Sequence, residues 1–197
     1  MAVSSPLRPL GVSSMTLVAI VAFAATSALS RRSTAIRGIR TVSALQLASF
    51  ACLSAYSNLG AWPAPSEAHL AARELAPLDG RPCCIRSGPS HAPIPFPRGA
   101  RGVDTARALV RDAILGGRLR APHNSARLLR ERVLDERYAH AHYAFRIGLF
   151  RFVDDVELLF DGSKRVIHFR SALRVGQGDM GANADRIAAL RAALAAA

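Results

Sequence analysis

Most of the polar residues that could do chemistry lie between residues 150 and 183. Carboxylates and arginines recur there at close spacing, in two runs where apolar and polar residues alternate. Such a cluster could bind a small polar ligand or a protein partner, although cross-strand ion pairing is the commoner role of charges on a sheet surface. The candidate ligand-binding or structural cluster comprises Asp154, Asp155, Glu157, Arg170, Ser171, Arg174, Asp179 and Asn183.

Asp154 is the unusual member of this cluster, because the alternation places it on the apolar face of its run. A buried carboxylate must be hydrogen-bonded or paired, or its pKa rises. It is therefore either a structural carboxylate that holds Tyr143, Ser171 or Arg174, or a general base at the end of a cleft. The second interpretation predicts a hydrolase or isomerase. No nucleophile–base pair is evident, so the sequence leaves the catalytic residues and the existence of an enzyme activity open.

Histidines on neighbouring runs offer a second kind of chemistry. If two-residue turns at 148–149 and 162–163 join the runs, polar side chains form two rows across one face of a sheet. These rows are His140–Glu157–His168 and His142–Asp155–Arg170. Zinc accepts histidine nitrogen and carboxylate oxygen, so the first row is a candidate metal site, although metal motifs are usually more compact. No cofactor is predicted.

Three glycines follow the second run, at Gly176, Gly178 and Gly181. Their spacing matches the glycine pattern of dinucleotide-binding loops, but the strand–helix–strand context of that motif is missing. The glycines either let backbone amides approach an anion at the start of the last helix or allow a tight strand-to-helix connection.

The elements that position these residues follow from periodicity. Alternation predicts strands over residues 127–134, 138–146, 150–160 and 165–171, joined by short turns. Apolar residues at helical spacing predict a helix over 105–115 with Asp104 as its cap, and a last helix that Asn183 caps. The expected fold is a two-layer α+β domain: an antiparallel meander of three to four strands, with a helix before and a helix after it on one face and the other face open.

The first hundred residues differ in composition from the rest of the chain. Residues 1–68 form a targeting leader, with a signal-like apolar segment at Met15–Leu29, an arginine-, serine- and threonine-rich segment without acids, and a second apolar run at 42–62. This order predicts delivery to a plastid, with the thylakoid as one destination, through the secretory route. A retained membrane anchor at 42–62, or secretion, is the alternative. A proline-rich, extended lead-in over 69–101 precedes the globular part at 102–197.

The basic character of the chain does not define a nucleic-acid partner. The formal net charge of the 197 residues is +12, but five arginines and no acids precede Glu67. Beyond the leader the charges are mixed in sign, and no recognisable nucleic-acid motif accompanies them. No specific nucleic-acid binding is predicted.

Several separated motifs resemble the domain of unknown function 1499 family, over about residues 79–194. They are Arg81-Pro82-Cys83-Cys84, Tyr138–Ala141, Phe150–Phe160 and Val166–Asn183, followed by Arg186 and Ile187 in the closing helix. The resemblance implies a small stand-alone domain, often behind a signal or membrane segment, with no established reaction. The sequence departs from the family pattern at Cys83, His142, Leu173 and Gln177.

Charged groups cluster without a nucleophile–base pair, which favours an organellar binding or accessory module for a small polar ligand or a protein partner. A hydrolase or isomerase with an aspartate base is the first alternative. A structural component of a membrane assembly, associated through residues 42–62, is the second.

Overall fold

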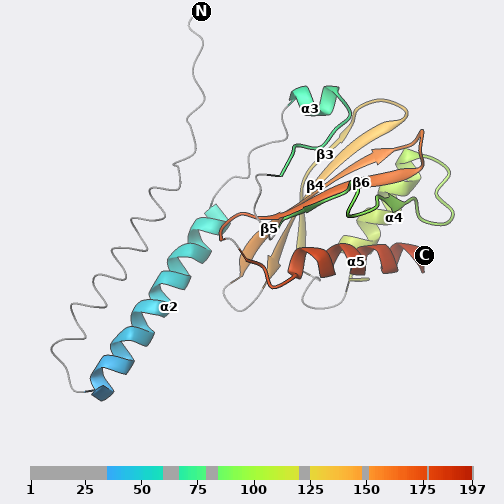
Figure 1. Ribbon diagram of the computed structural model, residues 1–197. Coiled ribbons are helices and arrows are strands. Elements are labelled where there is room, and N and C mark those ends of the chain that lie inside the picture. The colour runs from blue at the N-terminus through green and yellow to red at the C-terminus, as the bar shows by residue number, and fades with distance from the viewer. Residues whose placement is uncertain are drawn as a thin grey trace, which may run out of the picture. The chain divides into compact units, whose positions relative to one another are not determined.

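The computed structural model describes residues 35–59, 67–78, 84–119, 125–147, 151–176 and 178–196 (Figure 1). The chain divides into two compact units, Met1–Leu53 and Ser54–Ala197. The predicted signal-like segment at Met15–Leu29 lies outside the described residues.

Helix α2, Ala35–Leu59, contains most of the second apolar run. Serines, Gln46 and Asn58 interrupt its apolar residues, and two arginines lie in its first turns. Within the ranges that the structure describes, no helix combines the length and the apolarity needed to cross a membrane.

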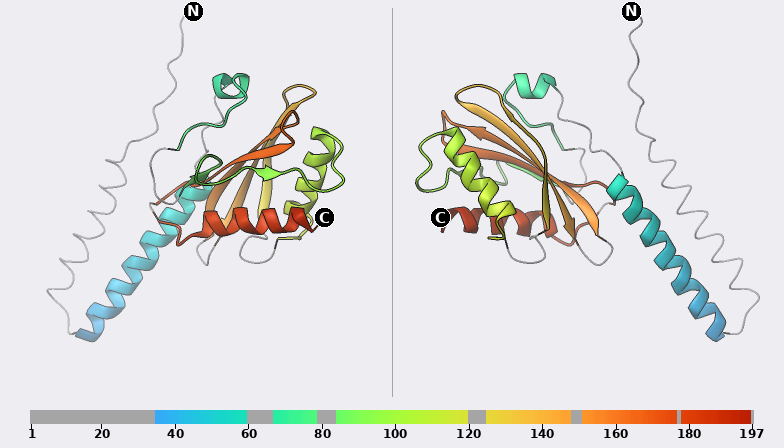
Figure 2. Two further views of the ribbon diagram at one scale, coloured as in Figure 1. Left: turned by 45° about the vertical axis from the view of Figure 1, so that its right-hand side comes forward. Right: turned by 180° about the vertical axis from the view of Figure 1, so that it is seen from behind.

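The second unit is built on one antiparallel sheet, so the expected α+β class is confirmed. The main strands are β3 (Ala126–Val133), β4 (Tyr138–Ile147), β5 (Phe152–Asp161) and β6 (Val166–Leu173). The sheet order is β1-β6-β5-β4-β3, with β2 also paired to β6 (Figure 2).

The expected number of strands was too small, because the lead-in contributes two. Strands β1 (Ile85–Arg86) and β2 (Ile94–Pro95) both pair with β6 and complete a six-stranded sheet. Two residues are too few to show an alternating pattern, and proline is tolerated in strands mainly at edges. Neither strand could therefore be found from periodicity.

Two helices cover one face of the sheet, as expected. Helices α4 (Val103–Leu115) and α5 (Ala182–Ala195) bury apolar side chains in a single core with β4, β5 and β6. That core includes Val110, Ile114, Ile187, Leu190, Tyr143, Phe145, Leu158, Phe160 and Phe169.

Both predicted helix caps were wrong. Helix α4 starts two residues earlier than a cap at Asp104 requires, and Thr105 Oγ1 accepts the backbone N–H of Gly102 at 3.0 Å. Helix α5 begins at Ala182, so Asn183 lies inside it. Asp179 takes the capping role: its carboxylate accepts the backbone N–H of Gly181 at 3.0 Å and of Asn183 at 2.7 Å.

The second face of the sheet is not open, which corrects the expected two-layer arrangement. Residues 67–78, which include α3 (Glu67–Ala71), run across it. Leu70 and Leu75 are buried in this segment, and Leu78 packs against the cluster of Cys84, Ala172 and Leu173. The polar side chains expected at the surface on this face are therefore buried as well.

The strand registers differ by two residues from those expected. Asp161 pairs with Val166, so a four-residue turn joins β5 to β6 and places Glu157 opposite Arg170 instead of His168. Ile147 likewise pairs with Phe152 across four connecting residues. Because side chains alternate with a period of two, this shift changes partners but leaves every residue on its predicted face.

Candidate functional site

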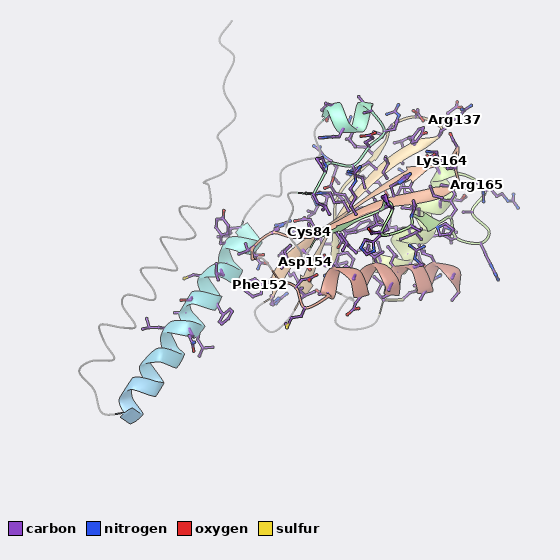
Figure 3. All side chains as sticks on the ribbon, in the orientation of Figure 1. Cys84, Arg137, Phe152, Asp154, Lys164 and Arg165 are labelled. Atoms are coloured by element: carbon purple, nitrogen blue, oxygen red, sulfur yellow. The ribbon has the colours of Figure 1, made fainter. Side chains whose placement is uncertain are left out.

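The sheet separates the predicted polar cluster into two groups. Asp154 and Asp155 are consecutive in β5 and point to opposite faces. Figure 3 shows Asp154 close to the start of α5. The group on the helix-covered face contains Asp154, Ser171, Asp179 and Asn183, and the group on the second face contains Asp155, Glu157, Arg170 and Arg174.

Arg186 of α5 organises the first group. Its Nη2 donates to Asp154 Oδ2 at 2.6 Å. Its Nη1 donates to Asn183 Oδ1 at 2.7 Å and to Ser171 Oγ at 3.1 Å. The guanidinium also lies over the Phe145 ring, with its carbon 4.9 Å from the ring centroid. A single arginine therefore joins the last helix to two strands of the sheet.

The Asp154–Arg186 ion pair is shielded from solvent. Both side chains are at most 1% exposed. Burial raises the pKa of Asp154 to about 6, although the charge and hydrogen bond of Arg186 act in the opposite direction. The carboxylate is ionised at neutral pH, but its place inside the core gives a substrate no access. The structural interpretation of Asp154 fits this geometry better than the general-base interpretation.

Two carboxylates of the second group each join a histidine to an arginine. Glu157 accepts from Arg170 Nη1 at 2.8 Å and lies 3.3 Å from His140 Nε2. Burial acts to raise the pKa of Glu157, but the His140 hydrogen bond and the Arg170 charge outweigh it and lower the pKa. Glu157 is therefore ionised and structurally paired.

The second pairing lies further along the same strands. Asp155 Oδ1 lies 2.7 Å from His142 Nε2, and Arg174 donates to both oxygens of that carboxylate, at 2.5 and 2.9 Å. The expected neighbours His140–Glu157 and His142–Asp155 are thus brought together. The third member of each row differs from the expectation, being Arg170 and Arg174, because of the two-residue shift in register.

The geometry does not assemble the candidate metal set. His168 lies opposite Leu159, away from the His140–Glu157 contact. Among the residues that the structure describes, no group of three or more histidine, cysteine, aspartate or glutamate side chains could hold a metal ion.

The glycine loop serves the strand-to-helix connection. Gly176 and Gly181 have φ values of 101° and 84°, a left-handed conformation that favours glycine. The side chain of Asp179 already occupies the N–H groups of Gly181 and Asn183 at the start of α5. That carboxylate takes the position that an anion would need at this helix end.

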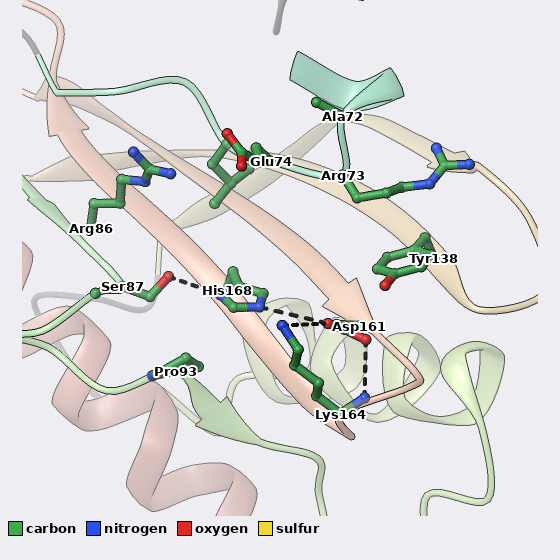
Figure 4. A pocket seen from close by; sticks show the side chains of 12 residues that line it. Ala72, Arg73, Glu74, Arg86, Ser87, Pro93, Tyr138, Asp161, Lys164 and His168 are labelled. Atoms are coloured by element: carbon green, nitrogen blue, oxygen red, sulfur yellow. Dashed lines mark hydrogen bonds and ion pairs between the residues drawn. The ribbon is translucent and has the colours of Figure 1, made fainter. Parts of the chain in front are cut away.

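A pocket of about 520 Å³ opens beside the second group, on the face that residues 67–78 cross (Figure 4). Its volume lies within the range of small-molecule sites. Its walls combine the segment after α3, the end of β1 and the loop that follows it, the start of β4, and the β5–β6 turn with the start of β6. The polar and charged side chains that line the pocket are Arg73, Glu74, Arg86, Ser87, Tyr138, Asp161, Lys164 and His168.

Arg86 is a charged side chain of this pocket that lies beside another arginine. It pairs in register with Arg170, so two arginines lie directly across from each other on neighbouring strands. Arg170 is neutralised by Glu157, whereas no ion pair joins Arg86 to another described residue. Like charges in this position destabilise a sheet. The arrangement is favourable when a bound anion compensates the second charge.

His168 lies between a hydroxyl and a carboxylate in the same pocket. Its Nδ1 is 3.4 Å from Ser87 Oγ, and its Nε2 is 3.9 Å from Asp161 Oδ2. Burial lowers the pKa of His168; Asp161 opposes this effect, while Lys164 and Arg86 add to it. The imidazole is therefore neutral at pH 7.

Sequence reasoning found only part of these two sites. His168 was singled out, but as a metal ligand, and Arg186 appeared only as a match to a family motif. For Arg186, the available signal was a lone arginine beside the apolar residues Ile187 and Leu190 of the last helix. Arg86 and Ser87 carried no signal, because β1 is only two residues long and Ser87 lies directly after it.

The structure therefore defines a small α+β domain with a buried arginine–carboxylate network and a pocket lined by charged side chains. The chain belongs to the family described as Protein of unknown function (DUF1499), whose model matches residues 64–194. No curated protein and no solved structure matches the chain.

Proposed function

We propose that this protein is a binding module for a small anionic ligand, which it holds in the pocket beside β6. The observation that carries the proposal is the cross-strand pair of Arg86 and Arg170, in which only Arg170 has an acidic partner among the described residues. A carboxylate or phosphate group placed against Arg86 would remove the repulsion and form charge-assisted hydrogen bonds.

Three cationic side chains and two carboxylates, Glu74 and Asp161, line the pocket. Arg73 and Lys164 line the pocket together with Arg86. The acidic lining residues are partly engaged: Asp161 accepts two backbone N–H groups at 2.9 and 3.0 Å through Oδ1. Arg73 is itself paired, with Asp135 at 2.6 Å, so Arg86 is the main free positive charge in this part of the pocket.

Two members of the predicted polar cluster, Glu157 and Arg170, lie next to this site. Glu157 fixes Arg170, and Arg170 in turn limits where the Arg86 side chain can lie. Glu157 and Arg170 therefore act as a scaffold for Arg86, and the ligand contacts fall to Arg86 and Lys164.

Titration calorimetry of the purified protein with inorganic phosphate and with succinate tests the proposal. We expect Arg86→Ala to weaken binding about 10-fold to 100-fold, since a hydrogen bond to a charged group contributes about 1.5–3 kcal/mol. Arg130→Ala is the matched control, because Arg130 is exposed on β3, outside the pocket. Equal binding by the Arg86→Ala variant, or no binding of either anion, would overturn the proposal.

We also propose that the leader directs the protein to a plastid through the secretory route. The support is the order of segments within residues 1–68: apolar, then arginine-rich without acids, then apolar again. A fluorescent protein fused behind residues 1–68 should accumulate in plastids. Its appearance in the medium would contradict the proposal, and resistance of the full chain to alkaline carbonate washing would favour the anchor at 42–62.

A further inference from the structure

We propose that the pocket is also a serine esterase centre, in which Ser87 is the nucleophile and His168 the general base. This inference rests on the proposed function, because it assigns a substrate class to the same site: esters of small dicarboxylic acids that keep one free carboxylate.

Three side chains from separate segments lie in a line along one side of the pocket (Figure 4). The Ser87 hydroxyl is 3.4 Å from His168 Nδ1, within reach of a proton transfer once a substrate tightens the site. In the resting state, Nδ1 of the neutral imidazole accepts a hydrogen bond from the Ser87 hydroxyl. The ring proton then lies on Nε2, which faces Asp161 Oδ2 at 3.9 Å. Asp161 thus favours the tautomer that the base requires.

Asp161 is held in place independently of His168. It is 3% exposed, and its Oδ1 accepts the backbone N–H groups of Ser163 and Lys164 in the turn that follows. Its second oxygen therefore remains directed toward the imidazole and the Lys164 ammonium, each 3.9 Å away. An anchored carboxylate behind a histidine stabilises the imidazolium that forms during catalysis.

The environment of Ser87 favours its deprotonation. The backbone N–H of Phe169 donates to Ser87 Oγ at 3.2 Å. This bond uses a lone pair of the oxygen and leaves the hydroxyl proton free for His168. It also stabilises negative charge on Oγ as the proton departs, and the adjacent Arg86 charge acts in the same direction.

The reaction then balances with water as the only co-reactant. Ser87 Oγ attacks the ester carbonyl carbon while its proton passes to His168 Nδ1. The carbon–oxygen bond to the alcohol breaks, and the leaving alkoxide takes that proton. Water attacks the acyl-serine, gives a proton to His168 and releases the acid, and His168 returns the proton to Ser87. Arg86 binds the free carboxylate of the acyl group or the developing oxyanion.

Hydrolysis of the mono-4-nitrophenyl ester of succinic acid tests the inference on the full chain. We expect a burst of one equivalent of 4-nitrophenolate per chain, faster than with 4-nitrophenyl acetate, and a mass increase on Ser87 after treatment with a fluorophosphonate. Ser87→Ala and His168→Gln should each lower the rate at least about 100-fold, the usual contribution of a general base. Ser125→Ala is the control, because Ser125 is exposed outside this pocket.

Each outcome decides between the two proposals. Phosphate binding without hydrolysis above buffer, or hydrolysis unchanged in Ser87→Ala, rejects the esterase and leaves the binding module. Hydrolysis lost in both variants while phosphate binding persists supports it and shows that they are folded. If Ser87→Ala fails to fold, since Phe169 donates to that hydroxyl, His168→Gln and the labelling site still give the answer.

Discussion

Asp154 and Arg186 form an ion pair that is buried in the core of this domain. The raised pKa of Asp154 makes the stability of the domain depend on pH. Burial raises the pKa of Asp154 from its ordinary value of 3.8 to about 6. A group whose pKa is higher in the folded state stabilises that state at low pH, and this contribution is lost as the pH rises through the folded value. The contribution of Asp154 to the free energy of unfolding should therefore decrease between about pH 4 and pH 6.

The variant Asp154→Asn isolates this effect. Asparagine does not titrate, so we expect the free energy of unfolding of the variant, relative to wild type, to rise by up to about 3 kcal/mol between pH 4 and pH 7. Urea denaturation at four pH values across this window measures the difference. A constant difference at all pH values would show that the pKa of Asp154 is not raised.

Removal of Arg186 should be far more damaging than removal of a surface arginine. Arg186→Met leaves the Asp154 carboxylate buried without its counter-charge, which we expect to cost about 3–5 kcal/mol at pH 7. The loss should be smaller at pH 5, where Asp154 can take up a proton. The double variant Asp154→Leu/Arg186→Met should recover much of the stability. If it is as unstable as the single variant, the hydrogen bonds to Ser171 and Asn183 matter more than the charge pair.

At the scale of elements, Asp179 determines how α5 begins. Its carboxylate accepts the N–H groups of Gly181 and Asn183, and also the Asn183 side-chain amide at 2.8 Å. We expect Asp179→Ala to reduce stability by about 1–2 kcal/mol, the usual effect of losing a helix cap. Asp185→Ala in the first turn of the same helix is the control, because Asp185 is exposed. Equal effects on the melting temperature would assign the loss to helix-dipole charge instead of capping.

Alternation in the sequence was sufficient to place the four long strands and to assign their faces, but it could not fix the register. A strand that slips by two residues keeps the same residues in the core, so burial does not distinguish the two alignments. The lengths of the two connections decide the register, and both proved two residues longer than the expected turns. This is why Glu157 joins His140 to Arg170 and not to His168.

At the scale of the whole molecule, the candidate pocket depends on segments that have no common sequence signal. Its walls combine the turn after α3, the end of β1, the start of β4 and the β5–β6 turn. Ser87 and His168 are 81 residues apart in the chain. Local patterns predict which side chains share a face, whereas this site exists only because the lead-in folds back across the sheet.

The last prediction concerns the segment that folds back across the sheet. Residues 67–78 cover the second face, where His140, Asp155 and Glu157 are at most 1% exposed. A chain that begins at Ser54 retains this cover, and we expect its melting temperature to lie within about 4 °C of the full chain, equivalent to about 1 kcal/mol.

A chain that begins at Cys84 loses the buried side chains of Leu70 and Leu75 and opens the polar rows to water. Each leucine lost from a core costs about 2–5 kcal/mol, so this shorter chain should be largely unfolded and should bind a hydrophobic dye. Circular dichroism melts of the two chains make the comparison. If both melt alike, residues 67–78 are dispensable for folding, and the burial of the second face does not depend on them.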